Sequence, residues 1–336
     1  MAATTQSTKK QNFIIRFFTM NTSREVGGRK LPLWRQLLLQ LLALLIAFEV
    51  MFPIMYILTL SFSSKSTRPS TLQLIPTEIS LTAYKQVIDR PTANPVTFAV
   101  LLRNSFLLSF SVGFVAILVA VLASYAFSRF KFKLRQVLMV LVFIPLLMPG
   151  VGLITPLFLL LNSFRIYTCG NGIAIAPFTT CAQGGATLLF NLRDSLFGVG
   201  IAMTAGALPF AVWILKGYID TIPLELEEAA KIDGADANQV FTRIVLPLAV
   251  PQLAVTFFLS FMGYWQEFAL PWLFLTKPQD YTLSMTLYNM VGQYASSIPW
   301  NRFAAMSVIV ALPIAIIYIA LQKQIVSGLT AGGIKG

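Results

Sequence analysis

Six apolar runs, each long enough to cross a lipid bilayer, limit this chain of 336 residues to a small set of folds. A helix needs about 20 apolar residues to cross the roughly 30 Å of hydrocarbon in a bilayer. Backbone N–H and C=O groups inside lipid must be paired within their own segment, so we expect each run to be a helix. The sequence therefore predicts an all-α integral membrane protein with six transmembrane helices, at about residues 37–62, 105–127, 137–162, 196–215, 248–275 and 303–321.

The composition supports a membrane protein. Hydrophobic residues make up 56% of the chain and charged residues 11%, and the mean hydropathy is +0.73. A soluble domain normally has about a quarter of its residues charged. The net charge of +12 could indicate a protein that binds nucleic acid. However, the basic residues fall between the apolar runs, which favours a signal for membrane topology. We expect no nucleic acid among the partners.

Several common chemistries are excluded by what the sequence lacks. The chain has no histidine, which is the commonest general base and metal ligand. Its two cysteines cannot form a four-ligand zinc site alone. No segment matches the phosphate-binding pattern G-x-x-x-x-G-K-[ST]. We therefore predict no catalytic residue, no metal site and no cofactor bound by this chain, and a partner must perform any ATP hydrolysis.

The basic residues predict the orientation in the membrane. An even number of spans places both termini on one side. Sixteen of the 25 lysines and arginines fall on that side: seven before the first run, four between the second and third, three between the fourth and fifth, and two after the last. Loops rich in Lys and Arg stay in the cytoplasm. We expect both termini to be cytoplasmic and the protein to lie in the cytoplasmic membrane.

This topology divides the chain into parts. A cytoplasmic N-terminal extension covers 1–36, the first transmembrane helix 37–62, an outer loop 63–104, a transmembrane core 105–325 and a cytoplasmic tail 326–336. The core holds the other five spans. It also holds an outer insertion and a cytoplasmic loop, at 163–195 and 216–247.

The outer insertion contains both cysteines, Cys169 and Cys181, twelve positions apart. If the insertion faces an oxidising exterior, a disulfide between them would close a small hairpin-like loop. The alternative is a pair of free thiols.

Proline occurs in five of the six runs. A proline frees a backbone carbonyl and kinks a helix, and such kinks are common in membrane proteins where a pathway or moving parts exist. Proline is also frequent in membrane helices generally, so kinks related to function and ordinary composition both remain open.

The cytoplasmic loop carries the signals of two short helices. Pro223 suits the first turn of a helix, and the acidic residues that follow it would offset the positive end of the helix dipole. Gly234 can end this helix in a left-handed cap. Asp236 and Gln239 have the spacing of a capping box that opens the second helix.

The second helix is expected to end at Pro247, at the membrane surface. The two helices would meet at a corner of small residues that lets another backbone approach closely: Ala229, Ala230, Gly234 and Ala235. Helices that lie on lipid headgroups usually carry Lys and Arg on their polar face, whereas this segment carries mainly acids. The loop is therefore predicted to bind a protein.

The same loop contains a family signature. Glu228-Ala229-Ala230, three residues, Gly234, nine residues, Ile244, one residue and Leu246-Pro247 match the pattern EAA---G---------I-LP at every position. In this the chain resembles the membrane subunits of ABC importers. The resemblance implies a type I ABC importer permease fold. It also implies that the loop couples the chain to an ATPase subunit through Glu228, Ala229, Ala230, Asp233, Gly234, Ile244, Leu246 and Pro247.

From about residue 100 to its end, the chain resembles the carbohydrate-uptake group of that family, and in particular the smaller membrane subunit of maltose and maltodextrin importers (MalG type). The segments that carry this resemblance are "GALPFAVWILKGYIDTIPLELEEAAKIDGA", "YTLSMTLYNMVGQYA" and "QIVSGLTAGGIKG". The resemblance implies that the tail contacts the ATPase through Thr330, Gly332, Gly333 and Lys335. The outer insertion and the long basic N-terminal extension depart from the group.

The resemblance also implies the partners and the mechanism. The partners would be an ABC ATPase homodimer that binds ATP and Mg²⁺, a second, MalF-like membrane subunit, and an external solute-binding protein that delivers sugar. The importer would work by alternating access. The implied substrate is maltose or maltodextrin, or alternatively another oligosaccharide such as trehalose.

Two acidic residues lie inside spans, Glu49 in the first and Glu267 in the fifth. Carboxylates within a membrane often line a polar cavity. The stretch Tyr264, Trp265, Gln266 and Glu267 combines aromatic faces with hydrogen-bonding groups, which suits a sugar. We name these four as candidates for the translocation pathway. The alternative is that Glu267 caps a network between helices near the outer end of its span, and Glu49 is expected to bond to a partner helix.

Two other classes of protein were weighed. A secondary transporter would need inverted repeats and ion sites at mid-membrane, and the sequence shows neither an obvious repeat nor a cluster of proton-carrying groups. A membrane-embedded enzyme would need a nucleophile and a base, and no such pair stands out in the spans. An ATP-driven sugar permease is the prediction.

Overall fold

The computed structural model describes residues 33–67, 73–76, 78–169, 172–178, 187–293 and 298–333. The chain divides into two compact units. The first comprises Met1–Thr59 and Ser70–Thr77, and the second comprises Leu60–Pro69 and Glu78–Gly336.

The first unit is built on the helix α2 (Leu33–Ser61), which contains a continuous apolar span from Gln36 to Ser61. Near its end, the Thr59 hydroxyl donates to the carbonyl of Leu74 at 2.7 Å. The side chain of Glu49 is exposed. Its bond to a partner helix stays a prediction.

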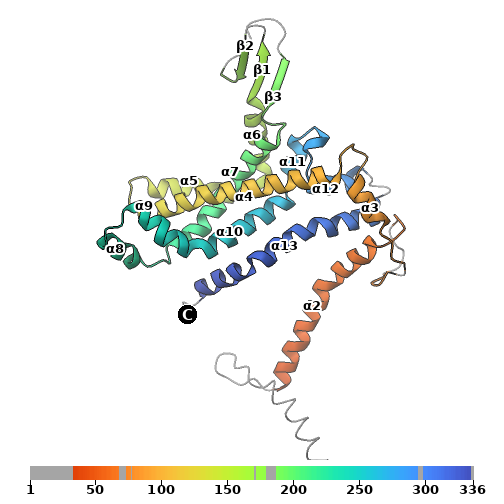
Figure 1. The fold of residues 1–336 in the computed structure, drawn as a ribbon, viewed down its shortest axis with the longest axis horizontal. Helices are drawn as coiled ribbons and strands as arrows, with labels where there is room; N and C mark the ends of the chain where they lie inside the picture. Colours follow the sequence, from red (N-terminus) through yellow and green to blue (C-terminus); the bar gives the residue numbers. More distant parts are fainter. Residues whose placement is uncertain are drawn as a thin grey trace, which may run out of the picture. The chain divides into compact units, whose positions relative to one another are not determined.

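The second unit is a bundle of four long helices that lie side by side (Figure 1). They are α4 (Phe98–Arg129), α7 (Leu196–Ile219), α10 (Leu246–Gln266) and α13 (Trp300–Gly333). Each extends beyond its predicted run at one end or both. The shorter helices are α3 (Thr82–Asp89), α5 (Arg135–Leu147), α6 (Gly150–Ser163), α8 (Leu224–Ile232), α9 (Ala237–Val240), α11 (Ala269–Phe274) and α12 (Leu283–Gln293).

The contact between α4 and α7 is built from small residues. Those of α4 include Ala116, Ala120 and Ser124, and α7 contributes Ala202, Ala207 and Ala211. Small side chains let two helix backbones approach closely, which is how membrane helices gain packing energy where lipid removes the hydrophobic drive between them. The buried Ser124 hydroxyl donates to the carbonyl of Val212 at 3.0 Å. This pair of helices forms the centre of the bundle.

The predicted span 137–162 is not one straight helix. Two helices, α5 and α6, replace it and differ in direction by 108°. Between them Met148 is extended, with ψ 139°, and it precedes Pro149. A residue before proline is disfavoured in the helical conformation because the proline ring crowds its backbone. With this pair counted as one broken span, the described residues hold six spans, as predicted.

The fifth predicted span, 248–275, begins earlier than expected. Pro247 does not end a helix, because one helical segment runs from Ala237 to Gln266. Within it Phe241–Val245 forms a π turn, in which the Leu246 N–H donates to the Phe241 carbonyl five residues earlier. Pro247 has no N–H to donate and would crowd the carbonyl four residues before it. The wider turn accommodates the proline without ending the helix.

The same span also ends earlier than expected. Glu267 is extended, with ψ 123°, and α11 starts afresh at Ala269. Pro271 lies four residues after Glu267, so in a continuous helix its ring would clash with the Glu267 carbonyl. The proline explains why the helix stops at Gln266.

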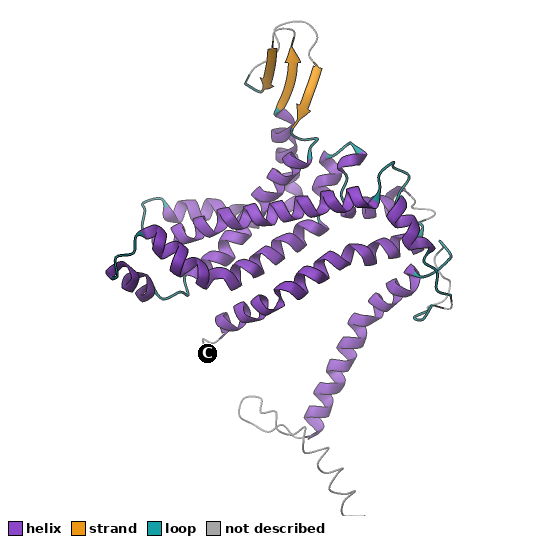
Figure 2. Cartoon of the chain, viewed as in Figure 1, coloured by secondary structure: helices purple, strands orange, loops and turns teal. Residues whose placement is uncertain are grey.

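The outer insertion contains a three-stranded antiparallel sheet that the all-α prediction did not include (Figure 2). The strands are β1 (Arg165–Cys169), β2 (Gly172–Ala176) and β3 (Thr187–Asn191), in the order β2-β1-β3. Cys169 ends β1 and is disulfide-bonded. Cys181, the only other cysteine of the chain, lies outside the described residues.

The start of α7 leads to a prediction. A methyl group added at Gly198 would collide with the backbone carbonyl of Leu192, whereas one added at Gly217, in the same helix, would meet no atom within 4 Å. We expect Gly198→Ala to destabilise the fold by about 1–3 kcal/mol through overpacking. Gly217→Ala should be neutral or stabilising by about 0.5–1 kcal/mol. Thermal unfolding in detergent checks this, and an unchanged Tm for Gly198→Ala would contradict it.

Candidate functional site

The corner between α8 and α9 has a fixed geometry at Gly234. This residue has φ +87°, in the left-handed region that favours glycine. The Gly234 N–H donates to the Lys231 carbonyl at 3.1 Å, and the Ala235 N–H donates to the Ala230 carbonyl at 2.9 Å. These two bonds are those of a Schellman motif, which satisfies the free carbonyls at a helix end. The predicted left-handed cap is confirmed.

The start of the second helix is also as predicted. The Gln239 N–H donates to Asp236 Oδ1 at 2.7 Å, and the Asp236 N–H donates to Gln239 Oε1 at 3.1 Å. This reciprocal pair is a capping box. The helix that it opens is continuous with the membrane span α10, so the second arm of the corner is the end of a long helix and not a separate short one.

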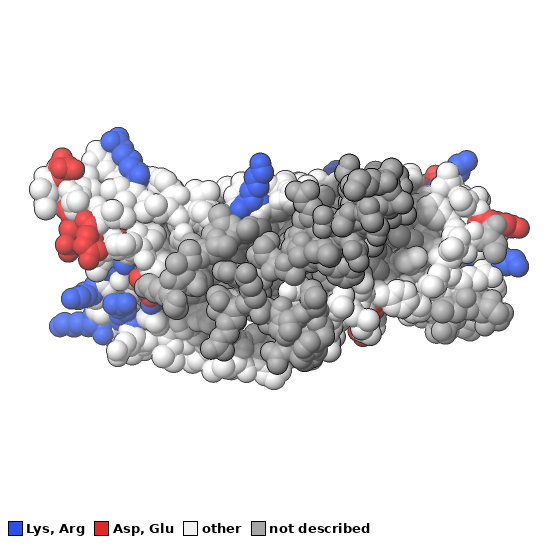
Figure 3. Space-filling view, turned by 90° about the horizontal axis from the view of Figure 1, so that it is seen from below, with Lys and Arg blue, Asp and Glu red and all other residues white. Residues whose placement is uncertain are grey.

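The corner presents acidic and apolar side chains outward. Figure 3 shows acidic side chains gathered at the end of the bundle that carries α8. The exposed members of the predicted site are Glu228, Ala229, Asp233, Gly234 and Pro247, while Ala230, Ile244 and Leu246 are half-buried. Beside them Ile232 is 86% exposed, and Leu224 and Leu226 are exposed as well. A contiguous exposed apolar patch can mark a site that binds another protein or a membrane.

Adjacent glutamates of α8 face opposite ways. Consecutive residues of a helix point about 100° apart, and here Glu228 is exposed whereas Glu227 is 2% exposed. The buried carboxylate of Glu227 accepts from Arg129 Nε at 2.6 Å and from the Tyr125 hydroxyl at 3.3 Å. The first turn of α8 is therefore bonded to the last turns of α4.

Arg129 also bonds to the end of α7. Its Nη2 donates to the carbonyls of Ile219 and Ile222, at 3.1 and 2.9 Å. The last carbonyls of a helix have no partner within the helix, and a basic side chain commonly satisfies them. One guanidinium thus holds together the ends of α4 and α7 and the start of α8.

A second polar link lies beside Arg129. Asp220, directly after α7, accepts from Ser128 Oγ at 2.5 Å and from Lys216 Nζ at 2.6 Å. Burial by itself would raise the pKa of Asp220, but the bonds from Lys216 and Ser128 outweigh it and hold this pKa below its usual value. The carboxylate is therefore ionised at neutral pH.

Sequence reasoning missed the pairing of Arg129 with Glu227. It assigned Arg129 to the membrane-topology signal and Glu227 to the helix dipole. The two residues are 98 positions apart, so no local pattern connects them. The only available signal for this pairing was that a basic residue ends one span and an acidic residue lies in a later loop on the same side of the membrane.

Apolar contacts underlie these bonds. Ile219, Ile222 and Val245 are buried together, and the rings of Tyr125 and Phe241 lie 4.9 Å apart between centroids. The corner therefore rests on a packed base formed by the ends of three helices.

The candidates for the translocation pathway lie at the other end of α10, and two of them have structural roles. Trp265 is 1% exposed, stacks on Phe261 at 5.4 Å, and donates from Nε1 to the Val310 carbonyl at 3.1 Å. Its side chain packs in a core cluster of the bundle, and its place in the pathway stays a prediction. Glu267 Oε1 accepts from the N–H groups of Ala269 and Leu270, at 2.8 and 3.2 Å. These two bonds cap the start of α11, and the roles predicted for Glu267, in the pathway or in a network between helices, stay predictions.

The other two pathway candidates differ in exposure. Gln266 is exposed, and Tyr264 is half-buried against α7 with its hydroxyl near Gly206. Their contact with a sugar stays a prediction.

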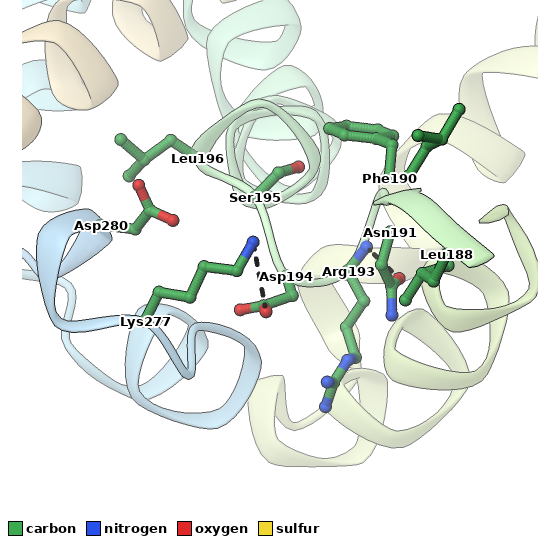
Figure 4. A pocket seen from close by; sticks show the side chains of 10 residues that line it. Leu188, Phe190, Asn191, Arg193, Asp194, Ser195, Leu196, Lys277 and Asp280 are labelled. Carbon is green, nitrogen blue, oxygen red and sulfur yellow. Dashed lines mark hydrogen bonds and ion pairs between the residues drawn. The ribbon is translucent and has the colours of Figure 1, made fainter. Parts of the chain in front are cut away.

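A pocket of about 480 Å³ lies at the start of α7, beside β3 (Figure 4). The Asp194 carboxylate accepts from the Thr276 N–H and hydroxyl, both at 2.8 Å, and lies 3.9 Å from Lys277 Nζ. Burial raises the pKa of Asp280, which also lines the pocket, and Asp194 adds to the rise while Lys277 opposes it. Figure 4 shows the Arg193 guanidinium turned away from this group, and it lies 5.1 Å from the centre of the Phe158 ring.

The remaining predicted positions lie in the tail. Thr330, Gly332 and Gly333 belong to the last turns of α13, and Lys335 lies outside the described residues. Within the described part of the chain no group of three or more acidic, cysteine or histidine side chains could hold a metal ion.

Residues 92–330 match the family described as "Binding-protein-dependent transport system inner membrane component". The chain belongs to this family. It is therefore a membrane component of a transport system and not an enzyme. The match includes the corner between α8 and α9 and all the helices of the bundle except the end of α13.

Similar proteins and structures support the assignment. The chain is 32% identical to "Maltose/maltodextrin transport system permease protein MalG" of Vibrio vulnificus (strain YJ016), over 83% of this chain and 90% of that protein. It is 34% identical to "Galactooligosaccharides transport system permease protein GanQ" of Bacillus subtilis (strain 168), over 66% of this chain and 69% of that protein. A crystal structure of a bacterial ABC transporter involved in the import of the acidic polysaccharide alginate shares the fold, with a TM-score of 0.64, 21% identity, and coverage of 86% of this chain and 95% of that one. The fold is that of a type I importer permease.

The geometry at Gly234 leads to a second prediction. Alanine at φ +87° is strained by about 1–2 kcal/mol, whereas asparagine tolerates this region better. We expect Gly234→Ala to loosen the cap of α8 and Gly234→Asn to preserve it. Hydrogen exchange at the Ala235 amide measures the bond to the Ala230 carbonyl. Equal protection in the two variants would contradict the role of the left-handed conformation.

Proposed function

We propose that this chain is the permease subunit of an ATP-driven ABC importer that carries a sugar across the cytoplasmic membrane by alternating access. The observation that carries the proposal is the exposed corner between α8 and α9, which holds the family signature and is fixed to the bundle at its base. The membership in a binding-protein-dependent transport family supports it. The names of the similar proteins support a sugar as the substrate.

The corner is proposed to bind an ABC ATPase homodimer, which holds the ATP and Mg²⁺. Three features support this partner: small residues that allow close approach, exposed acids, and exposed apolar side chains on α8. The tail residues Thr330, Gly332, Gly333 and Lys335 form the second proposed contact with the ATPase. Burial of Ile232 and Leu224 against that partner would remove their apolar surface from water.

The orientation follows from the basic residues. With the corner and both termini in the cytoplasm, the end of the bundle that carries Asp194 and Lys277 lies outside. A solute-binding protein is proposed to deliver sugar at that outer end, in keeping with the family description. A second, MalF-like membrane subunit is proposed to complete the pathway, since type I importers use two such subunits.

Maltose or maltodextrin is the proposed sugar. The similarity to MalG covers 90% of the MalG protein, whereas the similarity to GanQ covers 69% of the GanQ protein. The slightly higher identity to GanQ favours a galactooligosaccharide as the second candidate. Trehalose is a further alternative.

Docking of the ATPase can be tested at Ala229, which is exposed at the corner. Ala229→Trp should prevent close approach of the partner and lower the amount of ATPase subunit that co-purifies with the membrane subunits by about tenfold or more, the effect of losing about 1.4 kcal/mol of binding. Ala229→Ser is the matched control, because serine is small. Normal co-purification with the tryptophan variant would exclude this surface as the docking site.

The transport reaction can be tested by uptake of radiolabelled sugars. In cells that lack this gene, we expect the wild-type chain to restore uptake of maltotriose, and ATP depletion to abolish that uptake. Dissipation of the proton gradient at constant ATP should leave it intact. Uptake that follows the proton gradient would contradict an ABC importer.

The same cells identify the substrate. Competition by unlabelled galactotriose and by unlabelled trehalose is compared with that by maltotriose. If galactotriose or trehalose competes and maltotriose does not, the proposed sugar is wrong while the proposed class of transporter holds.

A further inference from the structure

We infer that Arg129 is a positioning residue that makes the end of α4 move together with α8 when the ATPase moves the corner. This inference rests on the proposed function of the corner. It concerns how a displacement of α8 is transmitted to the membrane bundle. It adds an ionic link to the covalent connection that runs through α9 and α10.

The link is a buried ion pair with several further bonds. The side chains of Arg129 and Glu227 are 9% and 3% exposed, and Nε lies 2.6 Å from Oε1. Both carboxylate oxygens of Glu227 are bonded, one to Arg129 and the other to the Tyr125 hydroxyl. Arg129 also donates from Nη1 to Ser128 Oγ and from Nη2 to the carbonyls of Ile219 and Ile222. A buried charge pair with several further bonds resists displacement, because separating the charges leaves a buried charge unpaired.

The covalent connections of α8 do not lead directly to α4. The segment 220–223 joins its start to α7, and Gly234 joins its end to α9. The Schellman bonds at Gly234 lie within the end of α8 and its cap. The ion pair, in contrast, ties the first turn of α8 directly to the last residue of α4.

The position of Arg129 determines which helices would move together with α8. It is the last residue of α4, and α4 packs against both α7 and α10. Its bonds to the Ile219 and Ile222 carbonyls join the end of α7 to the same point. A displacement of α8 is thereby transmitted to α4 and α7, the two helices at the centre of the bundle.

Removal of both charges tests the link without leaving a lone buried charge. In the complete transporter, reconstituted in proteoliposomes with its ATPase and binding protein, the double variant Arg129→Gln, Glu227→Gln should still bind the ATPase and hydrolyse ATP. The number of sugar molecules transported per ATP hydrolysed should fall by about 2- to 30-fold, the range expected for changes within a coupling network. A loss of stability alone would lower transport and hydrolysis together and leave this ratio unchanged.

The control is the nearby pair of Lys216 and Asp220, whose side chains are 16% and 43% exposed and which has the same charges and a 2.6 Å contact but does not reach α8. The double variant Lys216→Gln, Asp220→Asn should keep the wild-type ratio. The link is refuted, and the proposed function stands, if uptake by the wild type is driven by ATP and the Arg129→Gln, Glu227→Gln variant transports as many sugar molecules per ATP hydrolysed as the wild type. If the wild type shows no ATP-driven uptake, the proposed function itself fails.

A second measurement uses a transporter in which the ion pair is intact. Spin labels at Lys131 and Lys231, both exposed, report the distance between the end of α4 and the end of α8. We expect this distance to stay the same, within the width of its distribution, in the nucleotide-free and the ATP-trapped transporter. A change between the two states would overturn the inference, whatever the variants do.

Discussion

Backbone N–H and C=O groups cannot remain unpaired in the hydrocarbon of a membrane, and the rest of this structure depends on that constraint. It favours a helix in every apolar run, and at three of the prolines the helix changes. The break at Met148-Pro149, the π turn before Pro247 and the end of α10 before Pro271 are three local solutions to the same problem. Each solution sets the direction of a helix near a candidate site.

The sequence was informative wherever the signal was local. The left-handed conformation of Gly234 and the capping box of Asp236 and Gln239 were predicted because each involves residues within a few positions of one another. The apolar runs predicted the helices for the same reason, since the run of apolar side chains is itself what the bilayer requires. Family membership could be predicted because the signature lies in one short segment.

The sequence was uninformative wherever a residue's role depends on distant partners. Glu227 and Glu228 are adjacent and identical in type, yet one is buried against Arg129 and the other faces outward. Trp265 was expected near a sugar, and its packing with Phe261 and Val310 in a core cluster was not predicted. The strands of the insertion were missed because each has only five residues and the sequence that connects them is rich in Gly and Thr, and because the pairing of β1 with β3 spans a long connection.

Under the proposed function, the two ends of α8 have different roles in coupling. Its exposed end carries alanines and is followed by a glycine with open space around it, which lets a partner approach closely. At its other end the buried carboxylate of Glu227 bonds α8 to the end of α4. This carboxylate is tolerated in a bundle of low charge because Arg129 lies at the helix end, where basic side chains also satisfy free carbonyls. The proposed docking surface and the proposed link to the bundle are therefore different residues of one short helix, and a change that spares docking is still expected to uncouple α8 from α4.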